Sequence, residues 1–253
     1  MDTWHFFTLF AAFTVGAVIG SFSNVCIYRI PLHLSIVYPG SYCPACKTPL
    51  AVLDNFPVLS YIFLGGKCRY CQNRISWRYP TVELLTAIFY LTLFIRFDFS
   101  LFIIYALLVT VLIIITFIDF DYQIIPNVIT LPGIPIGLVL AYFFLPHTLM
   151  SALVGLLGGS GLLLLMALIY PGGMGGGDIK MIAMLGAFLG WKKVFLTIFL
   201  GSLIGSIIGI GLIVIKKQSR KTKIPFGPYL AAGAILSIFF GNSIIDYYLN
   251  FTF

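Results

Sequence analysis

Residues 101–121 read LFIIYALLVTVLIIITFIDFD. Residues 101–118 carry no charge, and the run approaches the roughly 20 apolar residues that a helix needs to cross a bilayer. Two carboxylates, Asp119 and Asp121, follow at its end. An unpaired acid is costly beside lipid, so acids in this position are candidates for a functional role. The stretch therefore predicts a membrane helix that ends in an acid at one membrane surface.

The composition of the whole chain indicates the same class of protein. Of its 253 residues, 60% are hydrophobic and only 9% are charged. Apolar runs and helix breakers predict an all-α polytopic membrane protein with eight spans, near 6–28, 81–97, 101–118, 128–145, 149–170, 178–190, 193–215 and 228–249. The first span lacks the basic start and the cleavage site of a signal peptide, so we expect it to remain in the mature protein.

The basic residues lie mostly between these spans. The formal net charge is +7, but positive charge placed between spans sets membrane orientation, so we expect no nucleic-acid partner. Alternation of eight spans puts the basic residues of 29–78, Lys180 and 216–223 on one side, and the positive-inside rule makes that side cytoplasmic. The acids Asp119 and Asp178 then reach the same cytoplasmic surface of the membrane.

The polar segment 29–80 carries two CxxC pairs, Cys43-Pro44-Ala45-Cys46 and Cys68-Arg69-Tyr70-Cys71. This spacing is typical of a zinc ribbon, in which four thiolates hold a tetrahedral ion. Disulfides or a redox role are the alternatives, which the reducing cytoplasm disfavours. We predict a structural Zn²⁺ bound by these four cysteines, with Cys26 as a small packed side chain. The domain boundaries would be 1–28 for the first helix, 29–80 for the zinc-binding insert and 81–253 for the remaining membrane core.

A second acid follows the glycine-rich stretch Gly172-Gly173-Met174-Gly175-Gly176-Gly177-Asp178. Glycine lacks a side chain that would hold an extended peptide away, and it adopts backbone angles denied to other residues. A phosphate-binding loop and a simple hinge are the alternatives, but the GxxxxGK[ST] spacing is missing. We predict that Gly175, Gly176 and Gly177 form a loop that binds a peptide substrate beside Asp178.

Two facing carboxylates would define the chemistry. They cannot both ionise cheaply, so the pair shares a proton and activates a water for peptide hydrolysis, without a metal. If Asp119 stood alone, it could be a helix-end acid solvated among lipid headgroups. A different class of protein is a membrane carrier whose aspartates bind cations or protons. A carrier predicts an internal repeat, whereas the surroundings of Asp119 and Asp178 are dissimilar.

The sequence closely resembles the prepilin peptidases, also called type IV leader peptidases, of the GxGD class of membrane aspartyl proteases. The resemblance covers nearly the whole chain. Besides the four cysteines, it includes residues 20–31 (GSFSNVCIYRIP), 54–61 (DNFPVLSY), 78–83 (RYPTVE), 175–180 (GGGDIK) and 225–229 (PFGPY).

The resemblance implies an endopeptidase that removes the basic leader of type IV prepilins or pseudopilins at the cytoplasmic membrane face, after a glycine. It maps the catalytic aspartates onto Asp119 and Asp178, with Asp121 in reserve. Many family members also methylate the new amino terminus with S-adenosylmethionine, an activity assigned largely to the cytoplasmic insert. The implied partners are prepilins of pilus, secretion or DNA-uptake machinery, and the lipid bilayer. A methyltransferase that has lost proteolysis is hard to reconcile with two retained aspartates.

Three further residues have structural interpretations. Where the family often has Ile-Pro-Asp, this chain has Ile125-Pro126-Asn127, and we expect the Asn127 side chain to cap the following helix. Pro80 and Glu83 fit a helix start, with the acid favoured by the helix dipole. Glu83 is also a candidate for the second activity of the insert.

Overall fold

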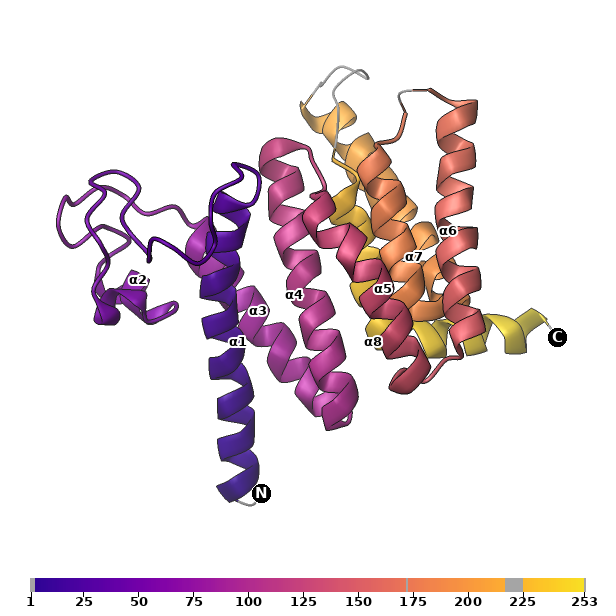
Figure 1. The fold of residues 1–253 in the computed structure, drawn as a ribbon, viewed down its shortest axis with the longest axis horizontal. Helices are drawn as coiled ribbons and strands as arrows, with labels where there is room; N and C mark the ends of the chain where they lie inside the picture. The colour runs from indigo at the N-terminus through magenta and orange to yellow at the C-terminus, as the bar shows by residue number, and fades with distance from the viewer. Residues whose placement is uncertain (1–2, 172, 217–224, 253) are drawn as a thin grey trace. The chain divides into compact units, whose positions relative to one another are not determined.

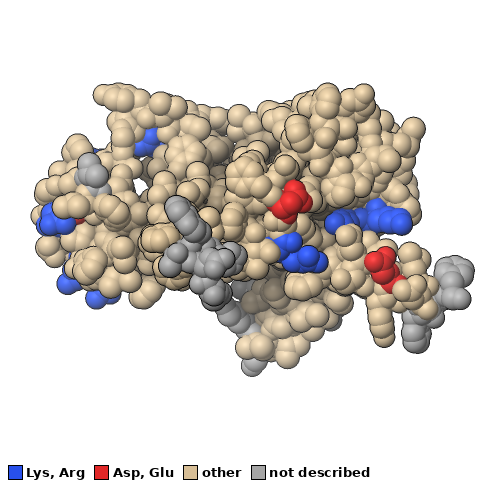
Figure 2. Space-filling view, turned by 90° about the horizontal axis from the view of Figure 1, so that it is seen from below, with Lys and Arg blue, Asp and Glu red and all other residues tan. Residues whose placement is uncertain are grey.

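The computed structural model describes residues 3–171, 173–216 and 225–252 (Figure 1). These residues form helices and no β-strand, apart from two isolated β-bridges, which confirms the predicted all-α class. The face drawn in Figure 2 is mostly uncharged, and its Lys and Arg side chains gather in a few places. The chain divides into two compact units, Met1–Ile114 and Ile115–Phe253.

Five helices in the described part of the chain are long and apolar enough to cross a membrane. They are Phe6–Arg29, Phe99–Tyr122, Leu149–Ile169, Gly176–Leu212 and Gly227–Asn250. Each exceeds or approaches the roughly 20 residues that span a bilayer. The chain is therefore a multi-pass membrane protein, as the sequence predicted.

The predicted number of eight spans is not confirmed. The expected spans 178–190 and 193–215 correspond to two helical segments of α7 (Gly176–Lys216), which the non-helical backbone of Gly190 separates. Helix α5 (Asn127–Phe143) is apolar but has 17 residues, and α3 (Arg78–Arg96) does not meet the same test of length and hydropathy. The predicted break within α7 therefore matches the structure, and it falls at a glycine, the residue that most readily adopts a left-handed φ.

The first unit contains α1 (Thr3–Arg29), η1 (Val52–Asn55), α2 (Leu59–Phe63), α3 and the first part of α4 (Phe99–Tyr122). Helices α1 and α3 pack against each other through small residues. A Cβ added to Gly16 would lie 2.7 Å from Tyr90 Cβ, and one added to Gly20 would lie 2.7 Å from Glu83 Cα. Small residues permit such close approach between membrane helices. Cys26 is buried with a free thiol, which confirms its predicted packing role.

The second unit contains the end of α4, α5, α6 (Leu149–Ile169), α7 and α8 (Gly227–Thr252). Helix α7 packs against α5, α6 and α8, so it is the central element of this unit. Gly155 of α6 and Gly186 of α7 face each other so closely that neither has room for a Cβ. Gly190 adopts φ +72°, and its non-helical backbone separates the two segments of α7.

Two predictions about organisation stay predictions. The division into 1–28, 29–80 and 81–253 differs from the two units, whose boundary falls inside α4. The orientation in the membrane relied partly on the basic run 216–223, most of which lies outside the described residues.

Candidate active site and metal centre

Asp119 lies in the last turn of α4 and is buried, with 5% of its surface exposed. Its Oδ2 atom accepts a hydrogen bond of 3.0 Å from the backbone N–H of Gly227, the first residue of α8. A carboxylate is favoured at a helix start because unpaired N–H groups there carry partial positive charge. A Cβ on Gly227 would lie 2.7 Å from the same oxygen, so this contact requires glycine.

Asp178 lies in the first turn of α7 and is also buried. Its Oδ2 atom accepts the Gly175 N–H at 3.2 Å, and its own backbone N–H donates to the Gly175 carbonyl at 3.1 Å. The other carboxylate oxygen, Oδ1, is buried and has no hydrogen-bond partner among the described residues. One oxygen is thus held by the loop, while the other is available to a reactant.

The structure brings the two predicted aspartates close enough for their carboxylates to interact electrostatically. Both belong to the second unit, although they come from different helices. The burial of Asp119 and its bond to Gly227 do not match an acid solvated among headgroups. Asp121, the reserve candidate, is exposed. Two interacting carboxylates are the feature that peptide hydrolysis without a metal requires.

The glycine loop beside Asp178 is tightly fitted at two of its three predicted positions. A Cβ on Gly175 would lie 3.1 Å from Asp178 Oδ2, and one on Gly177 would lie 2.8 Å from Ile125 Cβ. Gly176 has no neighbour within 4 Å of such a Cβ. The loop therefore needs glycine for its own geometry, and substrate binding by it stays a prediction. Gly172 lies outside the described residues.

The expected role of Asn127 is wrong. Asn127 is the first residue of α5, and the residue at the N-cap position, Pro126, makes no side-chain capping bond. The Asn127 Oδ1 atom instead accepts a 2.9 Å hydrogen bond from the Lys180 ammonium of α7. Because α5 and α7 pack together, a partner across the helix interface is available where the sequence suggested only a local one.

The four predicted zinc ligands come together in the first unit. The sulfur atoms of Cys43, Cys46, Cys68 and Cys71, called here the cysteine cluster, lie within 4.8 Å of one another. The Cys43 and Cys71 sulfurs are 3.9 Å apart. Four sulfurs about 2.3 Å from one tetrahedral zinc would be about 3.8 Å apart, so the cluster could hold a zinc ion.

The two CxxC segments repeat one backbone geometry. The N–H groups of Cys43 and Cys68 donate to the carbonyls of Thr48 and Asn73, respectively. The N–H groups of Lys47 and Gln72 donate to the carbonyls of Cys43 and Cys68, respectively. Lys47 and Gln72 both have positive φ, 61° and 57°. Isolated β-bridges, Tyr42 with Pro49 and Lys67 with Arg74, close the two turns. Each turn therefore aims a pair of thiols by local hydrogen bonds.

The thiols of the cluster have divergent acidities. Hydrogen bonds from the hydroxyl and backbone N–H of Thr48 lower the pKa of Cys46 to about 6. For Cys71, a hydrogen bond from the Asn73 backbone lowers the pKa, but burial and the neighbouring thiols outweigh it and raise the value to about 11. Zinc binds thiolates, so loading the cluster must release protons.

Glu83 does not have the helix-start role expected from its sequence position. It lies in the second turn of α3, and no acid occupies the first turn of that helix. It is buried, and its Oε2 atom accepts the N–H of Val58 at 2.7 Å, with a further bond from the Ser21 hydroxyl. Val58 has φ 61°, a conformation rare for a β-branched residue. The Glu83 carboxylate is therefore positioned by residues distant in the sequence, and not by the dipole of its own helix.

Two residues that contact the aspartate site were not predicted from the sequence. Gly227 donates to Asp119 across 108 positions of sequence, and Ile125 packs under Gly177. The signal for Gly227 was present in the stretch Pro225-Phe226-Gly227-Pro228-Tyr229, where a glycine stands at a helix start. Nothing in the local pattern says which acid it contacts.

Comparison with known proteins adds an independent line of evidence. Residues 14–97 match the model of the bacterial peptidase A24 N-terminal domain, and residues 106–210 match that of the type IV leader peptidase family. No solved structure matches the chain.

Curated relatives match along almost the entire chain. A prepilin leader peptidase/N-methyltransferase of Aeromonas salmonicida is 37% identical over 98% of this chain and 95% of its own length. Proteins of the same name from Bacillus subtilis (39% identical, covering 94% and 96%) and Pseudomonas aeruginosa (35%, covering 94% and 92%) also match. Because these relatives are 35–39% identical over at least 94% of this chain, the chain belongs to the type IV leader peptidase family.

Proposed function

We propose that this protein is a membrane aspartyl endopeptidase that removes the leader of type IV prepilins and then methylates the new amino terminus. The names of its relatives support both activities, since each is a prepilin leader peptidase/N-methyltransferase. The observation that carries the peptidase half is the buried pair Asp119 and Asp178, each with one oxygen held by a glycine N–H.

The catalytic residues in this proposal are Asp119 and Asp178, acting as a unit. One carboxylate accepts a proton from the attacking water while the protonated partner hydrogen-bonds to the scissile carbonyl, and the proton later passes to the departing amine. The unpartnered Oδ1 of Asp178 is the oxygen that faces the reactants. The Gly175 N–H holds Asp178 Oδ2, and the Gly227 N–H holds Asp119 Oδ2. The carboxylates therefore need little rearrangement for the reaction.

The peptide loop, the zinc ligands and the membrane face complete the proposal. Gly175, Gly176 and Gly177 border the substrate, and the cysteine cluster binds a structural zinc. The helix ends that carry the acids lie on the cytoplasmic side, where the leader of a prepilin is found. S-adenosylmethionine supplies the methyl group of the second reaction. The alternative of a non-enzymatic carrier has no support in the names of the relatives.

Cleavage of a model prepilin by the purified protein tests the peptidase half. Asp119→Asn and Asp178→Asn should each lower kcat/KM by at least about a thousandfold, because the water loses one of its two acids. Asp121→Asn is the matched control, with the same chemical change on an exposed residue two positions from Asp119, and should cleave normally. Retained cleavage in either of the first two variants, with wild-type thermal stability, would refute the assignment.

A further inference from the structure

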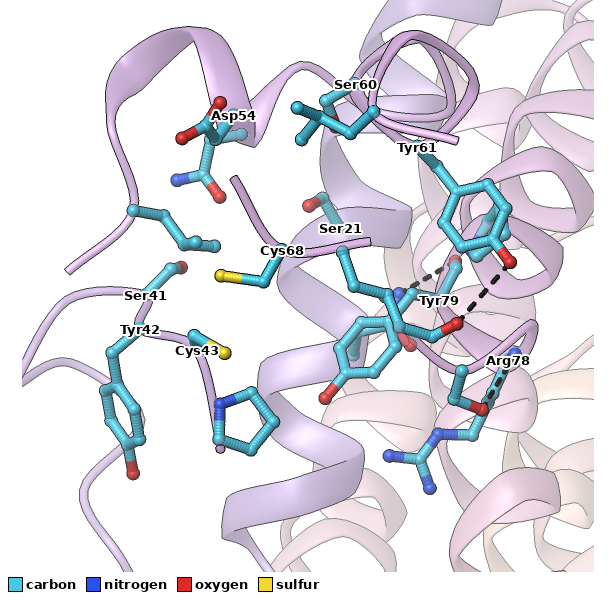
Figure 3. Close-up of a pocket in the computed structure, with 18 of the residues that line it drawn as sticks. Ser21, Ser41, Tyr42, Cys43, Asp54, Ser60, Tyr61, Cys68, Arg78 and Tyr79 are labelled. Carbon is cyan, nitrogen blue, oxygen red and sulfur yellow. Dashed lines mark hydrogen bonds between the residues drawn. The ribbon is translucent and has the colours of Figure 1, made fainter. Parts of the chain in front are cut away.

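Helix α2 turns its polar residues inward and its apolar residues outward. Ser60 and Tyr61 line a cavity of about 480 Å³, which α1, α3 and the loops of segment 29–80 enclose (Figure 3). The remaining residues of the helix, which do not line the cavity, are Leu59, Ile62 and Phe63. An amphipathic helix on the surface of a soluble domain has the opposite pattern, with its apolar side chains toward the core. Helix α2 therefore needs an apolar environment outside the insert.

These apolar residues are strongly exposed. None of the residues of α2 is buried, and the exposed fraction is 64% for Ile62 and 83% for Phe63. Trp77, immediately before α3, is 76% exposed, and its ring centroid lies 5.5 Å from that of Tyr61. Exposed apolar patches mark sites of interaction with another protein or with a membrane. We call Leu59, Ile62, Phe63 and Trp77 the outer surface of the insert.

The position of α2 along α1 favours the membrane. Helix α1 is long and apolar enough to cross a bilayer, and it ends at Arg29. The Glu83 carboxylate of α3 accepts hydrogen bonds from the Ser21 hydroxyl of α1 and from the N–H of Val58, the residue before α2. Ser21 precedes Arg29 by about two helical turns, so it lies about 12 Å closer to the bilayer centre than the end of α1. The start of α2 is therefore held at a depth that lipid occupies.

Lipid already faces α1 at this depth. Val18 and Phe22 are exposed apolar residues within the α1 span, so they contact acyl chains. An amphipathic segment in the interface sinks its apolar face about 5–10 Å into the boundary between headgroups and acyl chains, and tryptophan is enriched at that level. The outer surface has both features, an apolar face and a tryptophan, at the depth of the lipid-facing side of α1.

The charge of the insert complements anionic headgroups. Segment 29–80 has six basic residues, and its only acid is Asp54, which is buried in an ion pair with Arg69. Lys67 and Arg74 are exposed, and an isolated antiparallel β-bridge joins them shortly after α2. Basic residues near a membrane surface attract anionic lipids. The occupant that fits both the apolar and the basic side chains is thus a layer of anionic phospholipid.

We propose that the outer surface of the insert lies in the interfacial layer of a bilayer that contains anionic phospholipids. Its four apolar side chains contact the upper part of the acyl chains, and Lys67 and Arg74 contact the phosphates. The insert then lies on the membrane and is held there by lipid as well as by its connections to α1 and α3. This lipid contact is independent of peptide hydrolysis and of methyl transfer.

Fluorescence quenching by brominated lipids tests this location. The sample is the full zinc-loaded protein in vesicles of equal parts phosphatidylcholine and phosphatidylglycerol. The chain has three tryptophans, so Trp4→Phe and Trp191→Phe leave Trp77 as the only one. Bromine atoms near the headgroup end of the acyl chains should remove at least about a third of its emission, and at least about twice as much as bromine atoms near the terminal methyl.

Two further chains carry Trp77→Phe and place the tryptophan elsewhere. Ile62→Trp, on the exposed side of α2, should respond as Trp77 does. Val18→Trp is the control, an exposed position near the middle of the α1 span, and the deep bromine atoms should quench it more. Zinc content shows which chains are folded.

Two results would overturn the location. In the first, acrylamide dissolved in the water quenches Trp77 and the Ile62→Trp chain, while the brominated lipids do not. In the second, both chains resist both quenchers, because a protein such as a second copy of this chain covers the surface.

Moving the bromine between lipids tests the choice of anionic lipid. With the shallow bromine on phosphatidylglycerol, quenching of Trp77 should be at least about twofold stronger than with the bromine on phosphatidylcholine. Lys67→Gln together with Arg74→Gln should remove this difference, because the phosphate contacts are lost. Lys192→Gln together with Arg96→Gln, at exposed cations outside the insert, should leave it unchanged. Equal quenching by the two lipids before these substitutions, or a difference that survives at positions 67 and 74, would refute anionic lipid as the occupant.

Discussion

The cysteine cluster and the aspartate pair are both assembled from two segments of chain, but by different means. The two CxxC segments lie close together in the sequence, and each is shaped by hydrogen bonds within its own turn. Asp119 and Asp178 lie on different helices, and Asp119 is held by a residue 108 positions away. The first site depends on local backbone geometry, whereas the second depends on how α4, α7 and α8 meet.

The difference explains which kind of change each site should tolerate. A local turn keeps its shape as long as its own residues permit it. Metal binding contributes folding free energy that a large hydrophobic core would otherwise supply. A pair of buried acids has no metal to hold it, so it depends on close helix contacts that leave no room for a side chain.

The largest effect is expected from loss of a zinc ligand. Cys46→Ser should abolish stoichiometric zinc binding, which contributes about 10–16 kcal/mol to folding in zinc-finger peptides. Zinc per protein, measured by mass spectrometry, and trypsin cleavage within residues 41–76 report the change. Cys26→Ser is the matched control, since Cys26 is buried outside the cluster. Full zinc content in the Cys46 variant would show that this thiol is not a ligand.

Acid should have a related effect on the intact cluster. Thiolates bind zinc, and the free thiols hold protons that zinc must displace. Since the pKa of Cys46 is about 6 and that of Cys71 about 11, zinc affinity should fall as the pH falls and rise as it rises. A zinc affinity that does not change with pH would contradict thiolate ligation.

A smaller effect is expected at the aspartate pair from one added methyl group. In Gly227→Ala the new Cβ would lie 2.7 Å from Asp119 Oδ2, so the carboxylate or the start of α8 must move. A displacement of about 1 Å at a catalytic group costs about a hundredfold in rate. The measurement is kcat/KM for prepilin cleavage.

Gly176→Ala provides the control for that experiment. Its Cβ would meet nothing within 4 Å, so cleavage should change less than about threefold by the same steric argument. Equal losses in the two alanine variants would mean that the loss does not come from the contact between Gly227 and Asp119.

The smallest effect concerns the backbone of the turn formed by the second CxxC segment, Cys68 to Cys71. Gln72 has φ 57°, a conformation that costs most residues about 1–2 kcal/mol but not glycine. Glycine adds about 0.5–1 kcal/mol of chain entropy in the unfolded state, so Gln72→Gly should stabilise the zinc-loaded protein by no more than about 1.5 kcal/mol. Gln72→Val, with a β-branched side chain, should destabilise it. Thermal unfolding distinguishes them, and the opposite order would refute the geometry assigned to the turn.

Much of the fold and site could be predicted because the signals are short-range. The apolar run before Asp119 identifies a membrane helix, and the CxxC spacing identifies a metal cluster. Predictions failed where a distant partner replaced a local one. Asn127 binds Lys180 of α7, and Glu83 accepts Val58 N–H from a neighbouring loop. Capping and dipole rules consider one helix at a time, so they cannot anticipate either contact.

By itself, the sequence determined the membrane class, the helical segments, the acids at helix ends and the four thiols, because hydropathy and spacing are properties of single continuous segments of chain. Only the tertiary structure decided that Gly227 holds Asp119, that Asp178 lies near it, and that α2 turns its apolar side chains outward beside α1. Those relations depend on which helix faces approach each other, and side chains far apart in the chain set that approach.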